Sequence, residues 1–553
     1  EHILLLMLLV ISCHAHAEQP RYANAIASAH PLATEAGMQV LAEGGNAFDA
    51  AVTVAAVLAV VEPYGSGIGG GGFWLLHRAE DGKQVMLDGR ERAPLAAHRD
   101  MYLDDNGKVI PGLSLNGPLS AGIPGQVAAM VHLQQNYGSL PMTRLLQPAI
   151  DYARMGFAVE RIYLKLAEFR KDALKRYPAG REQLLAGGDL PQAGDLIRQP
   201  QLAMTLQQIA DKGHAGFYRG EVADRLVDGV RAAGGIWTHA DLEQYQVVER
   251  EPLRFDWQGL HITSAALPSS GGVVLAQILG MLKSQDLTEL EAYQRVHLLV
   301  EAMRRAFRDR AAYLGDTDYV DVPVNRLLGE RYLSELAQDL DPDMATPSEM
   351  LSPIAVKSQA GADTTHYSIL DRHGNRVAAT LSLNYPFGSG FVVPGTGVLL
   401  NDEMDDFAIS PGVPNAHGLS GNEFNAIAPG KRMLSSMSPT FIESDRRLAI
   451  VGTPGGSRII TMVLQAILGF KAGMTADEIV SLPRFHHQYL PDYIQLEPAA
   501  LDNASRRKLQ DMGHALKELS SSYGNMHLIM HDYPGQQTSA ASDPRGLGQA
   551  SVD

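Results

Sequence analysis

Hydrophobic residues follow two different spacings along the chain, which together predict a mixed α/β protein. Residues 32–41 have the three-and-four spacing of a helix, and the glycines at 44 and 45 end it. Residues 50–61 are apolar on every side, as expected of a fully buried helix. Residues 73–76 predict a strand, and the segment 120–340 is mostly helical in pattern.

The pattern changes to short strands after residue 364. Residues 365–370 and 376–384 flank a turn at 372–375, which is typical of a β-hairpin. A four-residue turn would place Thr364 opposite Leu383, and a register shift of one would place it opposite Ser382 or Asn384. In either case, residue 364 lies beside residues 382–384.

A long helix and a proline-containing loop are expected before this change. Apolar residues recur at helical spacing over 293–307, with Arg304, Arg305 and Arg308 between them. We interpret these arginines as a solvated helix face rather than a nucleic-acid patch. Residues 341–363 carry three prolines and little periodicity, which is the composition of an exposed loop that can be cleaved.

The first residues have the pattern of an export signal. Residues 3–11 are continuously apolar but too few to span a bilayer, and Ala15-His16-Ala17 is a signal-peptidase pattern. We expect residues 1–17 to be a signal peptide with a truncated positive segment, and the mature protein to be periplasmic or secreted. Residues 10–13 also resemble a lipobox, so a lipid anchor at Cys13 remains the alternative.

Composition narrows the function further. The chain has 553 residues with a hydrophobic share of 45 % and a charged share of 20 %, which is ordinary globular usage. A net charge of −16 and a pI of about 5.6 argue against nucleic acid as a partner. Cys13 is the only cysteine, so neither an intrachain disulfide nor a thiolate metal site can form. The rings of the adjacent His486 and His487 point apart, so we expect no metal.

A glycine-rich segment raises the question of a nucleotide cofactor. Gly65, Gly67 and Gly70 form a literal G-x-G-x-x-G. The dinucleotide fingerprint requires the order strand, loop, helix, whereas here the order is helix, loop, strand. We therefore expect no cofactor and interpret the glycines as a site of close backbone packing.

Short motifs follow one another along the whole mature chain. They are 43–47 (EGGNA), 49–51 (DAA), 69–72 (GGGG), Arg90-Glu91, 268–272 (PSSGG), 364–368 (TTHYS), 382–384 (SLN), 387–390 (FGSG), 399–407 (LLNDEMDDF), 428–432 (APGKR), 434–440 (LSSMSPT) and 452–457 (GTPGGS). In this order the motifs closely resemble those of the γ-glutamyltranspeptidases, a family of N-terminal nucleophile hydrolases.

The resemblance implies a four-layer αββα sandwich, made as one precursor that cleaves itself between Asp363 and Thr364. The products would be a large subunit, 18–363, and a small subunit, 364–553, which stay together as a heterodimer. A threonine hydroxyl is a weak nucleophile without a base beside it. Cleavage releases an α-amine with a pKa of about 7.7–8.0, so Thr364 then carries nucleophile and base together.

The resemblance also assigns the reaction. Thr364 would attack the γ-carbonyl of glutathione or another γ-glutamyl compound and form a γ-glutamyl ester. Ser382 would hydrogen-bond the nucleophile, and the N–H groups of Gly455 and Gly456 would form the oxyanion hole. Water as acceptor gives hydrolysis, whereas an amino acid or dipeptide gives transpeptidation.

The donor's charged groups have their own predicted partners. The resemblance implies that Arg90 binds the α-carboxylate as a fork, helped by Ser435 and Ser436. Three further residues would hold the α-ammonium and its surroundings: Asn384, Glu403 and Asp406.

One departure from the family pattern concerns the lid. Residues 411–418 resemble the family's lid loop, in which many members place a tyrosine that bonds the asparagine equivalent to Asn384. Here the position is His417, and this departure concerns both the gating of the site and the choice of acceptor.

Two other functions stay open at this stage. A β-lactam side-chain acylase, such as a glutaryl-cephalosporin acylase, shares the fold and nucleophile but not the specificity for both α-groups. A non-catalytic exported binder of amino acids or peptides would need no cleavage. The cluster of Arg90, Glu403, Asp406 and the two serines favours the transpeptidase.

Overall fold

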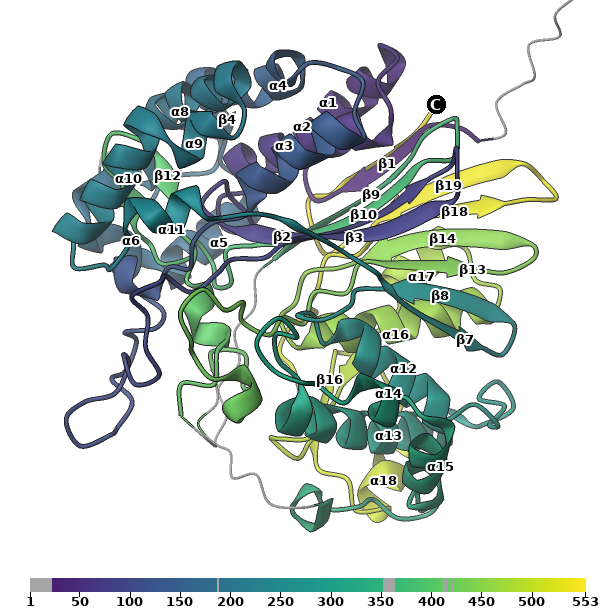
Figure 1. Cartoon of the computed structure of the whole chain (residues 1–553). Helices are drawn as coiled ribbons and strands as arrows, with labels where there is room; N and C mark the ends of the chain where they lie inside the picture. Colours follow the sequence, from purple (N-terminus) through teal and green to yellow (C-terminus); the bar gives the residue numbers. More distant parts are fainter. Residues whose placement is uncertain (1–21, 186–187, 352–363, 411–412, 414, 420) are drawn as a thin grey trace, which may run out of the picture.

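Two β-sheets lie face to face, and helices cover the outer side of each (Figure 1). The computed structural model describes residues 22–185, 188–351, 364–410, 413, 415–419 and 421–553. The arrangement is the four-layer αββα sandwich that the resemblance implies. The predicted signal peptide, Cys13 and Asp363 lie outside the described residues.

The first sheet has seven strands and the second has six. In spatial order, the first contains β20 (Gln549–Val552), β1 (Ala25–Ser28), β9 (Thr365–Leu370), β10 (Arg376–Ser382), β2 (Gly71–Arg78), β3 (Lys83–Gly89) and β6 (Val248–Arg250). The second contains β19 (Gln537–Ser542), β18 (His527–Asp532), β14 (Arg447–Gly452), β13 (Thr440–Glu443), β8 (Leu260–Ser264) and β7 (Leu253–Trp257). The small sheets are β4 (Phe157–Ala158) with β5 (Leu196–Ile197), β11 (Val392–Val393) with β12 (Val398–Leu399), and β15 (Phe485–His486) with β16 (Ile494–Leu496) and β17 (Leu516–Glu518).

Helices from the first part of the chain flank the seven-stranded sheet (Figure 1). They are α1 (Pro31–Ala42), α2 (Ala47–Val61), α3 (Gln126–Asn136), α4 (Met142–Met155), α5 (Arg161–Phe169), α6 (Lys171–Arg176), α7 (Pro178–Leu184), α8 (Pro200–Lys212), α9 (Ala215–Tyr218), α10 (Gly220–Ala232) and α11 (His239–Glu243). The other helices belong to the six-stranded side: α12 (Gly271–Met281), α13 (Ala292–Tyr313), α14 (Val324–Leu327), α15 (Glu330–Gln338), α16 (Arg458–Lys471), α17 (Ala476–Ser481) and α18 (Asn503–Asp511). Short 3₁₀ turns are η1 (Pro118–Ser120), η2 (Ser348–Leu351), η3 (Glu403–Asp406) and η4 (Glu423–Asn425).

Strand alternation explains why the sheets stack. Along β1, Ile26 packs into the core under the helices, whereas Ala25 and Ala27 face the core between the sheets. Successive side chains of a strand point to opposite faces, so a strand buried on both sides is apolar throughout. The core between the sheets also takes Leu75 from β2 and Ile450 from β14.

Several sequence predictions are confirmed. Helices α1 and α2 occupy the two predicted segments, and Asn46 caps α2 in a capping box with Asp49. The glycine run is a site of close packing, because a Cβ at Gly69 would overlap the Leu399 carbonyl.

The arginines of α13 correct one prediction. Arg304 and Arg305 are buried rather than solvated, and both pair with the buried carboxylate of Glu301. The segment that precedes the predicted cleavage site covers this face: Ser348, itself buried, accepts a 2.6 Å hydrogen bond from Arg304. Helical spacing indicates which side of a helix is polar but cannot show whether another segment covers it. Ser348 therefore packs on the protein, whereas most of the other residues of 341–351 are exposed, as predicted.

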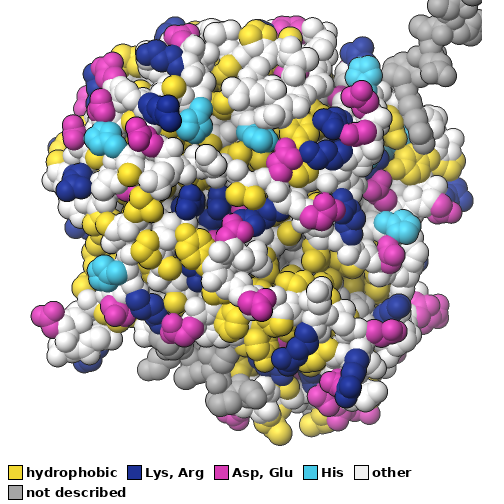
Figure 2. All heavy atoms as spheres, in the orientation of Figure 1, with side chains coloured by type: hydrophobic (Ala, Val, Ile, Leu, Met, Phe, Trp, Pro, Cys, Tyr) yellow, Lys and Arg dark blue, Asp and Glu magenta, His cyan; other side chains and the backbone are white. Residues whose placement is uncertain are grey.

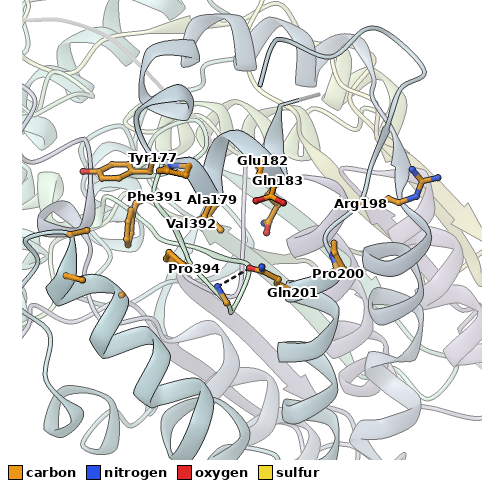
Figure 3. A pocket seen from close by; sticks show the side chains of 15 residues that line it. Tyr177, Ala179, Glu182, Gln183, Arg198, Pro200, Gln201, Phe391, Val392 and Pro394 are labelled. Carbon is orange, nitrogen blue, oxygen red and sulfur yellow. Dashed lines mark hydrogen bonds between the residues drawn. The ribbon is translucent and has the colours of Figure 1, made fainter. Parts of the chain in front are cut away.

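The outer surface is consistent with the charge argument. Figure 2 shows basic and acidic side chains interspersed over one face, so the described part of this face has no continuous basic stripe. Among the described residues, no helix is both long and apolar enough to cross a membrane. A pocket of about 640 Å³ opens where helices α7, α8 and α10 meet β11, and it is lined by residues such as Tyr177, Gln201 and Phe391 (Figure 3).

Candidate active site

One small cavity gathers nearly all of the predicted site residues. Its lining contains Arg90, Thr364, Ser382, Asn384, Glu403, Asp406, His417, Leu419, Ser435, Ser436, Met437, Gly456 and Ile459. Of the residues named from the sequence, only Gly455, which adjoins Gly456, and Asp363 are missing from this set. The free volume is about 20 Å³, so the described side chains leave room for little more than a water molecule.

Thr364 stands at the start of a central strand. It directly precedes β9, which lies between β1 and β10 in the seven-stranded sheet. Thr365 pairs with Leu381, so continuing the register by one residue places Thr364 beside Ser382. The hairpin loop therefore has five residues, not four, and of the three candidates Ser382 is the one opposite Thr364. Thr364 is 7 % exposed.

The loop after β14 presents two backbone N–H groups. Gly455 has a φ of 144° and Gly456 a φ of 57°, a conformation that side chains rarely adopt. A Cβ at Gly456 would lie 2.5 Å from His417 Nδ1, so glycine is also required by space. Within the described residues neither N–H has a hydrogen-bond acceptor, and both lie at the N-terminal end of α16. Such unpaired N–H groups at a helix start are suited to bind a developing negative charge.

Arg90 is the centre of a buried ionic cluster. Its guanidinium is 1 % exposed, and its two terminal nitrogens bond Glu403 Oε2 at 2.5 Å and Asp406 Oδ2 at 2.6 Å. Glu91 Oε2 lies 3.5 Å from the same guanidinium. The contacts to Glu403 and Asp406 span 313 and 316 residues of sequence, and η3 brings both carboxylates to Arg90.

Three carboxylates around one guanidinium cannot all ionise easily. Burial raises the pKa of Glu403 to about 7; Arg90 opposes this rise and Asp406 adds to it. Burial and the charge of Glu403 raise the pKa of Glu91 well above its ordinary value. The cluster therefore has more carboxyl groups than cations. A cation that binds beside Glu403 and Asp406 would favour the ionised form of Glu403.

The serine pair, Ser435 and Ser436, lines the same cavity and offers hydrogen-bond donors rather than negative charge. Ser435 Oγ accepts a hydrogen bond from Met437 N at 3.1 Å, and Ser436 Oγ accepts one from Arg310 at 3.2 Å. Each hydroxyl has one hydrogen to donate, and neither hydrogen has an acceptor among the described residues. Two adjacent free O–H donors match the two oxygens of a carboxylate.

His417 contacts Asn384 in the lining of the cavity. Asn384 Nδ2 donates to Asp402 O at 3.1 Å, so its Oδ1 is the acceptor in the 2.6 Å contact with His417 Nε2. The backbone carbonyl of His417 accepts a further bond, at 3.3 Å, from Gln488. The histidine thus makes the contact to Asn384 that the tyrosine makes in many members of the family that the chain resembles.

Comparisons with known proteins agree with this geometry. The family profile described as Gamma-glutamyltranspeptidase matches residues 33–553. A glutathione hydrolase proenzyme of Pseudomonas aeruginosa is 44 % identical over 95 % of this chain and 94 % of its own.

The chain belongs to the γ-glutamyltranspeptidase family.

Solved structures show the same relationship at two levels. The crystal structure of Helicobacter pylori γ-glutamyltranspeptidase is 42 % identical with a TM-score of 0.58, covering 59 % of this chain and 94 % of that one. A cephalosporin acylase from Bacillus halodurans superimposes with a TM-score of 0.84 at 26 % identity, covering 96 % of both chains. The fold is thus shared with acylases, whereas sequence identity is higher to the γ-glutamyltranspeptidases.

The γ-glutamyltranspeptidase site also contains residues that the sequence did not indicate. Glu91 lies in one of the quoted motifs but was given no role. Arg310, on α13, was not singled out, since the arginines interpreted as solvated are Arg304, Arg305 and Arg308. Leu419, Met437 and Ile459 add an apolar wall to the cavity, which suits an aliphatic chain. No group of three or more His, Cys, Asp or Glu side chains in the described ranges has the geometry to hold a metal.

Proposed function

We propose that this chain is a self-processing γ-glutamyl transferase and glutathione hydrolase that works through a Thr364 ester. The observation that carries the proposal is the meeting of Thr364, a free N–H pair, a carboxylate-binding serine pair and an acid cluster in one cavity. A γ-glutamyl group presents a carbonyl, a carboxylate and an ammonium, and each has a complementary partner there.

The proposed reaction begins when Thr364 Oγ attacks the γ-carbonyl carbon while its own α-amine takes the hydroxyl proton. The N–H groups of Gly455 and Gly456 stabilise the oxyanion. The bond to the leaving nitrogen then breaks, and that nitrogen receives the proton, so cysteinylglycine departs from glutathione. Water or an acceptor amine next attacks the ester and releases glutamate or a new γ-glutamyl amide. Ser382 adjoins Thr364 and is proposed to orient its hydroxyl.

Recognition of the donor is divided between the two sides of the cavity. Ser435, Ser436 and Arg90 bind the α-carboxylate, whereas Asn384, Glu403 and Asp406 bind the α-ammonium. His417 is the lid residue, because its bond to Asn384 closes the cavity and the small free volume requires this closure to open for a substrate.

Processing and export are part of the proposal. Cleavage between Asp363 and Thr364 would give subunits 18–363 and 364–553, which remain a heterodimer because both supply strands to both sheets. The H. pylori chain covers 59 % of this one, a share that fits a large subunit rather than a whole precursor. Removal of residues 1–17 would deliver the protein to the periplasm or the medium, with a lipid anchor at Cys13 as the alternative.

A denaturing gel together with a turnover assay tests the proposed function. We expect two bands, a small-subunit N-terminus at Thr364 by mass spectrometry, and release of p-nitroaniline from γ-glutamyl-p-nitroanilide that glycylglycine accelerates. One uncleaved band with ligand binding and no turnover would instead identify a non-catalytic binder. Because an acylase shares the fold, faster turnover of glutaryl-p-nitroanilide than of the γ-glutamyl compound would identify the acylase.

The raised pKa of Glu403 predicts how donor binding depends on pH. A carboxylate with a raised pKa is protonated in mild acid, so it attracts the donor's ammonium more strongly as the pH rises through about 7. We expect the KM for γ-glutamyl-p-nitroanilide to fall about three- to tenfold between pH 6 and pH 8, since ionisation changes by up to tenfold per unit below the pKa. Glu403→Gln should flatten this profile, whereas Glu423→Gln, an exposed acid on η4, should keep it. Identical KM profiles for the wild type and Glu403→Gln would contradict the assignment.

A further inference from the structure

Arg310 is a buried cation with no acidic partner in contact. It lies on α13, is 5 % exposed, and forms no ion pair with any carboxylate of the described residues, unlike the other buried arginines of this helix. Burial lowers the pKa of Arg310 to about 10, so the guanidinium remains charged at neutral pH. A buried charge without an ion pair is costly. The charge of Asp406 offsets part of that cost and the charge of Arg90 adds to it, so a further anion nearby would be stabilising.

The guanidinium contacts the serine pair by two routes. Arg310 Nη2 donates to Ser436 Oγ at 3.2 Å, and Nε donates to Ser270 Oγ at 2.9 Å. Ser270 in turn donates to the Ser435 carbonyl, from its hydroxyl at 2.7 Å and from its backbone N–H at 2.8 Å. One side chain therefore braces both residues of the Ser435–Ser436 segment from behind.

The direct contact also orients the hydroxyl. Because Ser436 Oγ accepts from a cation, its own hydrogen points elsewhere, and the side chain lines the cavity. Donation from a charged group also polarises the O–H and makes it a stronger donor. Arg90, by comparison, contacts Glu403 and Asp406 directly, so the charge that it offers the α-carboxylate is partly neutralised.

We infer that Arg310 is a positioning residue for the α-carboxylate of the donor: it orients the Ser436 hydroxyl directly and, by way of Ser270, fixes the backbone of Ser435. The inference rests on the proposed γ-glutamyl function and extends it. On this inference, the preference of the site for a carboxylate over a neutral group at the donor's α-carbon depends on Arg310, although Arg310 itself does not line the cavity.

The test compares two donors that differ only in that group: γ-glutamyl-p-nitroanilide and its α-carboxamide. The variants are Arg310→Gln, which removes the charge, and Arg310→Lys, which keeps it but cannot reach both serines. The control is Arg308→Lys, the neighbouring arginine of α13, which pairs with Asp309 instead. Cleavage into two bands confirms that each variant has folded.

For Arg310→Gln we expect the ratio of kcat/KM for carboxylate over carboxamide to fall about tenfold or more, the loss typical of a hydrogen bond to a charged group. The loss should lie mainly in KM for the carboxylate donor. For Arg310→Lys we expect a ratio between those of the wild type and Arg310→Gln. If Arg310→Gln is not cleaved, the ratio for Arg310→Lys decides the test. An unchanged ratio in cleaved protein would overturn the inference. No turnover by the wild type would count against the proposed function itself.

Discussion

Thr364→Ala is expected to remain a single full-length chain and to release no measurable p-nitroaniline from γ-glutamyl-p-nitroanilide. The variant lacks the hydroxyl that we propose attacks the carbonyl of residue 363 during cleavage and the γ-carbonyl during turnover. Without cleavage, the nitrogen of residue 364 also stays an amide and cannot act as a base. The loss of cleavage and the loss of turnover therefore both result from removing one oxygen atom. A denaturing gel measures cleavage, and the p-nitroaniline assay measures turnover.

Two further variants make this result specific. Thr364→Ser keeps the hydroxyl but lacks the methyl group that restricts χ1, so it should still cleave, more slowly than the wild type. Thr365→Ser is the matched control, because that buried threonine donates to Glu62 Oε2 at 2.5 Å and serine preserves the bond. Cleavage of Thr364→Ala at the same position, or turnover by the uncleaved chain, would refute the assignment of Thr364.

The neighbourhood of Thr364 could be predicted from the sequence because it is local. The alternation over 365–384 indicates a hairpin, and a hairpin places its two ends together. The register could not be predicted, because it depends on where Asp371 lies. The Asp371 carboxylate accepts from Ala47 N at 2.9 Å and from Asn375 N at 3.0 Å, which makes it part of the loop. The contact to α2 is a tertiary one that no local pattern reveals.

The rest of the site depends on distant segments. Arg90, Glu403, Ser435 and Gly456 come from four separate loops or turns, and nothing in their spacing indicates that they meet. Only the resemblance to a family brought them together before the structure did. Arg310 was not singled out from the sequence. Its helix has a polar face by pattern, and no local pattern shows that other segments of the chain cover that face.

Replacing Arg90 by methionine should lower the stability of the folded protein and abolish turnover. Removing one partner of a buried ion pair costs about 3–5 kcal/mol, because the remaining charge is left uncompensated. Here Glu91, Glu403 and Asp406 would all lose their counter-ion at once. We therefore expect Arg90→Met to unfold at clearly lower temperature than the wild type at pH 8 and to give no turnover. Arg90→Lys should retain part of the stability, because an ammonium keeps the charge without the fork.

The pH dependence of this loss has a defined sign. Without the guanidinium, the pKa values of Glu91 and Glu403 in the folded state would lie still further above their unfolded values. Stability from such groups is fully present below the unfolded pKa and is lost as the pH rises through the folded pKa. The Tm difference between the wild type and Arg90→Met should therefore shrink from pH 8 to pH 5.

Arg92→Met is the matched control for the ionic cluster. Arg92 is two residues away and half-buried, and it donates to the carbonyls of Gly430 and Gln244 rather than to carboxylates. Its loss should lower Tm by a similar amount at pH 8 and pH 5. If the Tm difference for Arg90→Met widened on acidification, or matched that of Arg92→Met at both values, the three carboxyls would not depend on Arg90 for their charge balance.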